Sequence, residues 1–149
     1  MVESDIANCF EAIPHDRLVA AVEERVCDRN VLKLLRTMLR AGVMLDGVVR
    51  RSDSGTPQGG VVSPLLANIY LHRLDKAWQD GGGVGVLVRY CDDLVVLCRS
   101  QKEAEGALGA LTDVLHGLGL EPKASKTRTV HLEEGGEGLD FLGFVRHER

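Results

Sequence analysis

The sequence predicts an α+β fold in which helices pack on one face of a mainly antiparallel sheet. Short Val- and Leu-rich runs that fit strands alternate with longer segments whose apolar residues follow helical spacing. Clusters of Gly, Pro and Asp separate these segments. The order is a strand, helices, a hairpin, a helix, a strand pair, a helix and further strands. This order favours an α+β layer and is compatible with a split βαβ arrangement.

The N-terminal half is expected to hold a strand, two helices and a hairpin. In order they are a strand at 2–6, a helix capped by Asp16 and reaching Val26, a helix at 30–40 ended by Gly42, and a hairpin over 43–51 around Asp46-Gly47. The apolar face of the second helix is predicted to consist of Val31, Leu34, Leu35, Met38 and Leu39.

The C-terminal half is expected to begin with a loop at 52–60. After it come a helix opened by Ser63 and Pro64 and reaching Trp78, a flexible linker at Gly81–Gly83, two strands flanking Asp92-Asp93, a helix at 102–118, a strand at 126–132 and a final strand at 139–145. No internal repeat or low-complexity tract interrupts this pattern.

Composition and length predict one globular domain. The chain has 149 residues, of which 44% are hydrophobic and 27% are charged. No apolar run has the length of a membrane span, and no signal-peptide pattern opens the chain, so we expect a cytoplasmic protein without membrane contact. The four cysteines form no CxxC pair, which favours reduced, mostly buried thiols and argues against a zinc site.

The net charge of −4 argues against a stand-alone nucleic-acid binder. Residues 1–30 hold seven acids and three bases and carry the whole excess, so a local basic surface remains possible further along. The candidates for phosphate contacts are Arg50, Arg51, Lys123 and Arg128. Most such residues are merely solvated, and the five histidines form no catalytic pairing.

Two adjacent aspartates, Asp92 and Asp93, lie between the apolar runs 86–89 and 94–98. The simplest interpretation is a hairpin turn, because Asp is common in turns. However, neighbouring carboxylates repel each other, and a tight hairpin usually contains Asn-Gly or Asp-Gly. Two carboxylates on a hairpin tip suit a hard divalent cation. In a split βαβ sheet the strand that ends at Asp5 can lie beside this turn, which would bring three carboxylates together.

Five segments, in this order, resemble the reverse transcriptases of group II introns. They are Asp5–Phe10, Ser54–Leu71, the Tyr90-Cys91-Asp92-Asp93 box, Gly119-Leu120 with Lys126-Thr127, and Phe141–Phe144. The long match around Gln58 is the most specific of them. The resemblance covers almost the whole chain and implies a polymerase palm fold.

The resemblance also implies the chemistry of RNA-directed DNA polymerases, which transfer deoxynucleotides to a primer 3′-hydroxyl with two Mg²⁺ ions. Mn²⁺ is a possible substitute. The implied metal site consists of Asp5, Ile6, Asp92 and Asp93, with Asp93 as the less direct ligand. For Asp5 alone the competing interpretation is a helix or turn cap. The implied partners are an RNA template, a DNA or RNA primer, dNTPs and the intron RNA.

Further site residues follow from the same resemblance, each with a structural alternative. Phe10 would close the sugar pocket and exclude a 2′-hydroxyl, or it is a core residue. Gln58 and Gly59 would touch nucleotide or template, or they form a plain loop. Lys126 would protonate or offset the pyrophosphate, or it is a surface lysine. Phe141, Leu142 and Gly143 would form the primer grip, or they end a buried strand.

The sequence departs from the family pattern at several positions. Cys91 stands where Ala is usual, Asn8-Cys9 replace a common Gly-Phe, and Pro14 replaces a usual Asp. Upstream fingers and a downstream thumb are expected to lie outside residues 1–149, so we expect the chain alone to be weak or inactive as a polymerase. The alternatives are a retron, diversity-generating or CRISPR-associated reverse transcriptase, or a non-catalytic RNA-binding maturase module.

Overall fold

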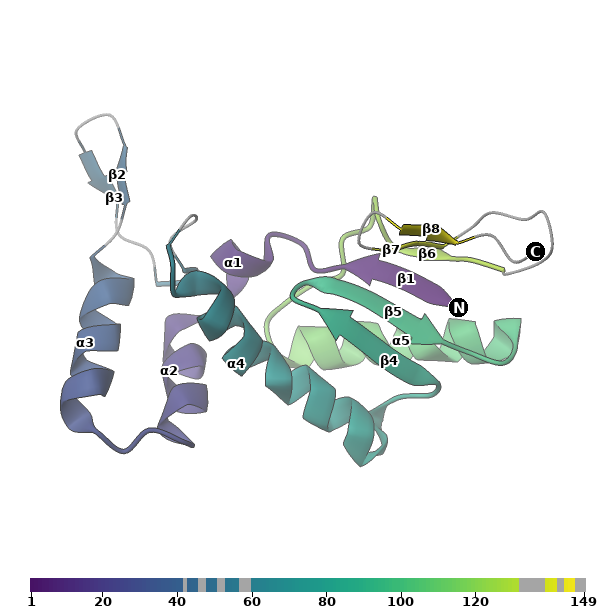
Figure 1. Cartoon of the computed structure of the whole chain (residues 1–149), viewed down its shortest axis with the longest axis horizontal. Helices are drawn as coiled ribbons and strands as arrows, with labels where there is room; N and C mark the ends of the chain where they lie inside the picture. Colours follow the sequence, from purple (N-terminus) through teal and green to yellow (C-terminus); the bar gives the residue numbers. More distant parts are fainter. Residues whose placement is uncertain are drawn as a thin grey trace. The chain divides into compact units, whose positions relative to one another are not determined.

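The computed structural model describes residues 1–41, 43–45, 48–50, 53–56, 60–131, 139–141 and 144–146. Its principal sheet contains β1 (Val2–Asp5), β4 (Val86–Tyr90), β5 (Asp93–Leu97) and β6 (Arg128–Thr129). The strands lie in the order β4-β5-β1-β6, and every neighbouring pair is antiparallel (Figure 1). The predicted α+β class with an antiparallel sheet is therefore confirmed.

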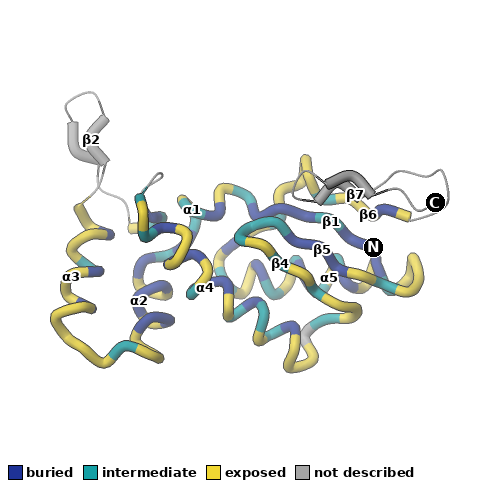
Figure 2. Tube along the Cα trace, in the orientation of Figure 1, coloured by how far each residue is buried: buried dark blue, intermediate teal, exposed yellow. Residues whose placement is uncertain are grey.

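Helix α5 (Gln101–Gly117) packs against β1 and β5. The Ser100 side chain accepts a hydrogen bond from Glu103 N at 3.2 Å, and the Glu103 carboxylate accepts one from Arg99 N at 2.7 Å. The first bond satisfies a backbone donor that the helix start leaves unpaired, and the second ties the residue before the N-cap to the first turn. The apolar face of α5 is buried at Ala104, Ala107, Leu111 and Leu115. The helix thus covers the sheet, as the buried stretches of β1, β5 and α5 indicate (Figure 2).

Contacts divide the chain into two compact units, Met1–Ala7 with Leu74–Arg149, and Asn8–Arg73. The first unit holds the principal sheet and α5. The second holds α1 (Cys9–Ala12), α2 (His15–Glu23), α3 (Arg29–Arg40) and the hairpin of β2 (Val43–Leu45) and β3 (Val48–Arg50). Helix α4 (Ser63–Ala77) begins in the second unit and ends in the first.

The two helices α2 and α3 pack against each other, and both differ from expectation. Helix α2 ends at Glu23 and does not reach Val26. Helix α2 begins at His15 after Pro14, so Asp16 lies in its first turn and is not the N-cap. In α3 the buried residues are Leu32, Leu35 and Leu39, whereas Val31, Leu34 and Met38 are 48%, 61% and 46% exposed. Leu35 and Leu39 are therefore buried as predicted, but Leu32 completes the buried face in place of Val31, Leu34 and Met38.

The glycine-rich segment after α4 is not the predicted linker. Trp78–Gly82 forms one π-helical turn, η1, in which Gly81 has φ of 101°. The Trp78 indole N–H donates to Gly85 O at 3.2 Å, and a side chain at Gly83 would collide with the indole ring. The ring therefore fixes this segment, because only glycine leaves room for it.

The C-terminal strands are shorter than predicted. The strand expected at 126–132 is reduced to the two residues of β6. The single strand expected at 139–145 is instead an antiparallel hairpin of β7 (Leu139–Phe141) and β8 (Phe144–Arg146). The predicted hairpin at 43–51 is confirmed by β2 and β3, although Asp46 and Gly47 lie outside the described residues. Gly42 does as well, so its role at the end of α3 stays a prediction.

All four cysteines are free thiols, but the prediction that they are mostly buried was wrong. Cys9 is buried, Cys27 is exposed, and Cys91 and Cys98 are partly exposed. Within the described ranges, no helix is long and apolar enough to cross a membrane.

Candidate active site

The three aspartates meet where β1 and the β4–β5 hairpin end. Antiparallel pairing sets Asp5 of β1 directly opposite Asp93 of β5. The amide of Ile6 donates to the Asp92 carbonyl at 3.2 Å and ties the end of β1 to the hairpin turn. Directly opposed residues of an antiparallel pair share one face, with Cβ atoms about 5 Å apart. The predicted convergence of Asp5, Asp92 and Asp93 is therefore present.

The turn that carries these carboxylates is strained. Tyr90 pairs with Asp93, so Cys91 and Asp92 form a two-residue connection. Cys91 has φ of +52°, a conformation that residues with a Cβ rarely adopt and that glycine usually supplies in hairpins. Asp93 is already the first residue of β5, whereas the sequence suggested that both aspartates lie in the turn.

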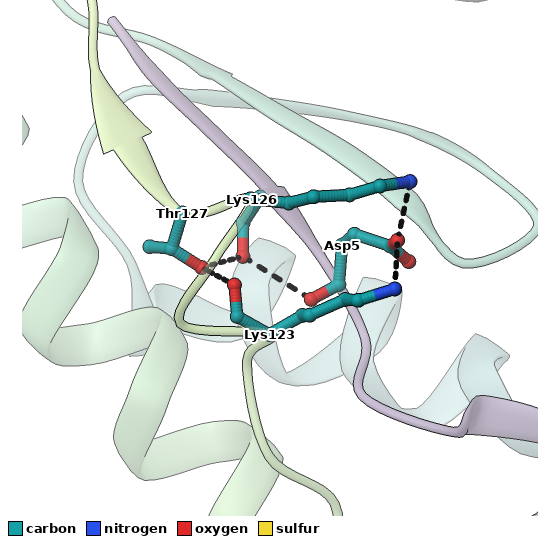
Figure 3. Close-up of polar contacts among 5 residues, drawn as sticks. Asp5, Lys123, Lys126 and Thr127 are labelled. Atoms are coloured by element: carbon teal, nitrogen blue, oxygen red, sulfur yellow. Dashed lines mark hydrogen bonds and ion pairs between the residues drawn. The ribbon is translucent and has the colours of Figure 1, made fainter.

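The carboxylate of Asp5 is buried, and only one of its two oxygens is paired with lysine. Asp5 is 7% exposed. Its Oδ2 lies 2.8 Å from the Lys126 ammonium and 3.8 Å from that of Lys123 (Figure 3). Its Oδ1 is buried and has no hydrogen-bond partner among the described residues. Because an unpaired buried carboxylate oxygen is costly, this atom is a ready ligand for a cation.

The two lysines are held by a short turn that docks on β1. The Lys123 amide donates to the Asp5 carbonyl at 2.7 Å, and the Lys126 amide donates to the Lys123 carbonyl at 2.9 Å. The Thr127 hydroxyl donates to the Lys123 carbonyl at 2.9 Å (Figure 3). It also contacts the Ser4 hydroxyl at 2.9 Å. Lys123 was considered only as a phosphate contact in the sequence, and its ion pair with Asp5 was not expected.

Burial raises the pKa of Asp92 more than any other effect, and the charges of Asp5 and Asp93 raise it further, while a backbone hydrogen bond opposes them. The pKa of Lys126 is also raised, chiefly by its hydrogen bond to Asp5. The charges of Asp5 and Asp93 thus contribute to both shifts, although burial is the larger cause for Asp92. Their negative charge favours a cation at this end of the sheet.

The residues fit a divalent metal by their chemistry. Three carboxylates supply the hard oxygens that Mg²⁺ and Mn²⁺ prefer, and Asp5 offers an unpaired buried oxygen. Ile6 can contribute only its backbone carbonyl. In the arrangement seen here, where lysines face Asp5, no group of three or more His, Cys, Asp or Glu in the described part of the chain is placed to share one ion.

Arg89 was missed by the sequence analysis. Its guanidinium donates to the Asp75 carboxylate through Nε at 2.8 Å and through Nη2 at 2.6 Å, and its Nη1 donates to the Cys91 carbonyl at 3.0 Å. All three residues belong to the first unit. A lone arginine before the Tyr90 box carries no signal in a single sequence that separates it from a surface charge.

The predicted nucleotide-binding residues belong to the second unit, where the loop before Gln58 is tied to α1. The Phe10 carbonyl accepts a hydrogen bond from Thr56 N at 2.6 Å, and Gly55 N donates to Ile13 O at 2.8 Å. His15, which is buried, contacts the Gly55 carbonyl through Nε2 at 2.5 Å. The Phe10 side chain is partly exposed.

Several predicted site residues are not described by the structure. Gln58, Gly59, Leu142 and Gly143 lie outside the described residues. Phe141 is placed by its backbone in β7, one residue from the hairpin connection. Their roles in nucleotide binding and the primer grip stay predictions.

The family model for reverse transcriptases (RNA-dependent DNA polymerases) matches residues 1–145. The chain belongs to the reverse transcriptase family. The group II intron-encoded protein LtrA of Lactococcus lactis is 45% identical over 75 residues, which cover 50% of this chain and 12% of LtrA. An uncharacterised 91 kDa protein in the cob intron of Schizosaccharomyces pombe is also 45% identical over 75 residues, which cover 50% of this chain and 9% of that protein.

These relatives confirm the resemblance of this reverse transcriptase to the group II intron type. The chain spans only about a tenth of the length of these two relatives. A solved structure of apo telomerase from Candida tropicalis is similar over 95% of this chain and 32% of that protein, with a TM-score of 0.66 and 13% identity. At this identity the likeness establishes the fold, which is that of a polymerase palm.

Proposed function

We propose that this reverse transcriptase chain adds deoxynucleotides to a primer 3′-hydroxyl on an RNA template, with two divalent ions held by Asp5, Asp92 and Asp93. The observation that carries this proposal is the pairing of Asp5 with Asp93 across β1 and β5, with Asp92 next to them in the turn. Nucleotidyl transfer needs such a cluster of hard oxygens, because negative charge builds up on the phosphate during the reaction.

Asp5 and Asp92 are proposed to bridge the ions, and Asp93 and the Ile6 carbonyl to complete the site. When bound, Mg²⁺ would activate the primer hydroxyl and offset the charge of the leaving oxygens. The unpaired Oδ1 of buried Asp5 supports this assignment. The raised pKa of Asp92 is due chiefly to burial and further to the charges of Asp5 and Asp93, and a bound cation would offset both effects by stabilising the carboxylate.

Lys126 is proposed to leave Asp5 and meet the pyrophosphate. In the structure its side chain is 56% exposed and lies on a turn whose backbone is fixed to β1. A long, exposed side chain can change partner at little cost, and a lysine ammonium away from Asp5 is still protonated at neutral pH and able to donate. We propose that Phe10 excludes the 2′-hydroxyl and that Gln58 and Gly59 contact nucleotide or template.

Phe141, Leu142 and Gly143 are proposed to support the primer strand. An intron RNA is the proposed template, since the similar LtrA is a group II intron-encoded protein. The same relatives favour an intron origin over a retron, diversity-generating or CRISPR-associated one. Because the chain spans a small part of its relatives, we expect the 149 residues alone to extend primers weakly.

The test is RNA-templated addition of one dNTP to a labelled primer, with protein in excess so that a slow single turnover is visible. The wild type is expected to add the nucleotide with Mg²⁺ or Mn²⁺, and Asp92→Asn to lose at least 100-fold in rate. The exposed Asp113→Asn on α5 serves as the matched control. Unchanged addition by Asp92→Asn would reject the proposal in favour of another site, and metal-independent RNA binding without any addition would favour a non-catalytic maturase module.

A further inference from the structure

Arg89 and Asp75 form a fork-to-fork ion pair inside the first unit. Two nitrogens of Arg89 meet the two carboxylate oxygens of Asp75 at 2.8 and 2.6 Å. The side chains are only 12% and 26% exposed, in contrast to the exposed pairs elsewhere, such as Arg73 with Glu24 at 31% and 58%. A bidentate and largely buried pair fixes the plane of the guanidinium, which an exposed pair does not.

The third nitrogen of the same guanidinium contacts the strained turn between β4 and β5. Arg89 Nη1 donates to the Cys91 carbonyl at 3.0 Å, and Cys91 is the residue with φ of +52°. A residue with a Cβ holds such a conformation only when its surroundings impose it. The bond from Arg89 is a charged hydrogen bond to that residue, immediately before Asp92.

The strand register shows that Arg89 acts from the far side of the sheet. Tyr90, Asp93 and Asp5 are directly opposed in neighbouring strands and share one face. Arg89 is opposite Leu94, one position along, so it projects to the other face. Arg89 therefore leaves the sheet on the face opposite to Asp5 and Asp93, and its hydrogen bond to the Cys91 carbonyl connects it to the turn that carries Asp92.

We propose that Arg89, oriented by Asp75, is a positioning residue that holds the Cys91-Asp92 turn in the conformation in which Asp92 and Asp93 bind the divalent ions. This inference rests on the proposed metal role of the aspartates. The carboxylate of Asp75 in α4 thereby connects the end of that helix to the metal site. Arg is required at position 89, because a lysine ammonium cannot make two parallel bonds to Asp75 and a third to Cys91.

The test measures Mn²⁺ affinity by the loss of the free-ion EPR signal, which requires no polymerase activity. Arg89→Met and Asp75→Asn are each expected to weaken Mn²⁺ binding about 10- to 100-fold, as the loss of an orienting partner does in other metal sites. The double variant should bind no more weakly than the weaker single variant, because the two side chains act as one unit. Arg73→Met, which breaks the exposed pair on the same helix, should bind like the wild type.

Unfolding is followed by circular dichroism, so that affinity is compared only among folded variants. Arg89→Lys keeps a charge opposite Asp75 and serves where Arg89→Met does not fold; it too should weaken Mn²⁺ binding. Wild-type Mn²⁺ affinity in folded Arg89→Lys or Asp75→Asn would overturn this inference while leaving the proposed function intact. Wild-type affinity in Asp92→Asn would instead overturn the proposed function itself.

Discussion

The Oδ2 atom of Asp5 and the Nζ atom of Lys126 lie 2.8 Å apart, joining the end of β1 to a turn 121 positions later in the chain. The carboxylate of this pair is buried and the ammonium is exposed. Asp5 is therefore matched by a positive charge in the absence of metal. A divalent ion that binds Asp5 has to displace this ammonium or share the carboxylate with it.

Removing the ammonium is predicted to have opposite effects on metal binding and on catalysis. Lys126→Met should strengthen Mn²⁺ binding by a few-fold at most, because the competing contact is exposed and screened. The same variant should slow single-nucleotide addition by about 10² or more, because it loses the proposed proton donor. EPR titration and single-turnover kinetics measure the two effects separately.

Lys102→Met provides the control, because Lys102 is an exposed lysine on α5. It should change neither quantity. If Lys126→Met weakened Mn²⁺ binding, the idea that Lys126 competes with the metal for Asp5 would be wrong.

The raised pKa of Asp92 predicts that this residue destabilises the metal-free fold at neutral pH. The folded state holds the Asp92 proton to a higher pH than the unfolded chain, where Asp has a pKa of about 3.9. Stability from this group is therefore full below about pH 4 and is lost as pH rises through the folded-state pKa. Asp92→Asn, which cannot ionise, should be more stable than the wild type at pH 7 in EDTA.

This difference should shrink at pH 3.5, where the wild-type carboxyl is protonated as well. Adding Mn²⁺ at pH 7 should raise the melting temperature of the wild type but not that of Asp92→Asn, since a ligand at 100 times its Kd stabilises by about 2.7 kcal/mol. Thermal unfolding followed by circular dichroism gives the melting temperatures of both proteins under all three conditions. A less stable Asp92→Asn at pH 7 would contradict the assigned cause of the pKa shift.

Gly55 is predicted to be irreplaceable in the second unit. Its φ is +88°, and an added Cβ would lie 2.9 Å from the backbone of Glu11. Gly55→Ala should therefore lower the free energy of unfolding by about 1–3 kcal/mol. Gly106→Ala on α5 is the matched control, because its Cβ meets nothing within 4 Å and should stabilise by up to about 1 kcal/mol. If urea denaturation showed that Gly55→Ala lowers the free energy of unfolding by no more than about 0.5 kcal/mol, the prediction would be wrong, because the backbone around Gly55 would have adjusted to the added Cβ.

Most of the strands and helices followed from the sequence because their periodicity is local, whereas the C-terminal strands did not. The double-aspartate hairpin and its approach to Asp5 were predictable, since apolar runs on both sides leave the carboxylates no place in the core. The face of α3 was not predictable: Leu32, Leu35 and Leu39 compete with Val31, Leu34 and Met38 at equally good helical spacing. Which leucines are buried depends on the partner helix, and a single sequence does not specify that.

The polar framework around the aspartates was the least predictable part of the site. The Arg89–Asp75 pair joins residues 14 positions apart through a helix end and a strand, and the Lys123–Asp5 contact depends on how one turn docks on β1. Such contacts arise from tertiary geometry and leave no local pattern. The motifs shared with reverse transcriptases pointed to Asp5, Asp92 and Lys126 as candidate site residues. They did not indicate that Arg89 contacts the turn before Asp92 or that Lys123 pairs with Asp5.

The most direct measurement is an anomalous difference map from crystals of this chain soaked in Mn²⁺. The proposed function predicts a manganese ion coordinated by carboxylate oxygens of both Asp5 and Asp92, with the Lys126 ammonium displaced from Asp5. The peak should be absent in Asp92→Asn crystals treated in the same way. No ion between Asp5 and Asp92 at saturating Mn²⁺, or manganese bound only elsewhere, would contradict the central claim that these aspartates form the metal site of a polymerase.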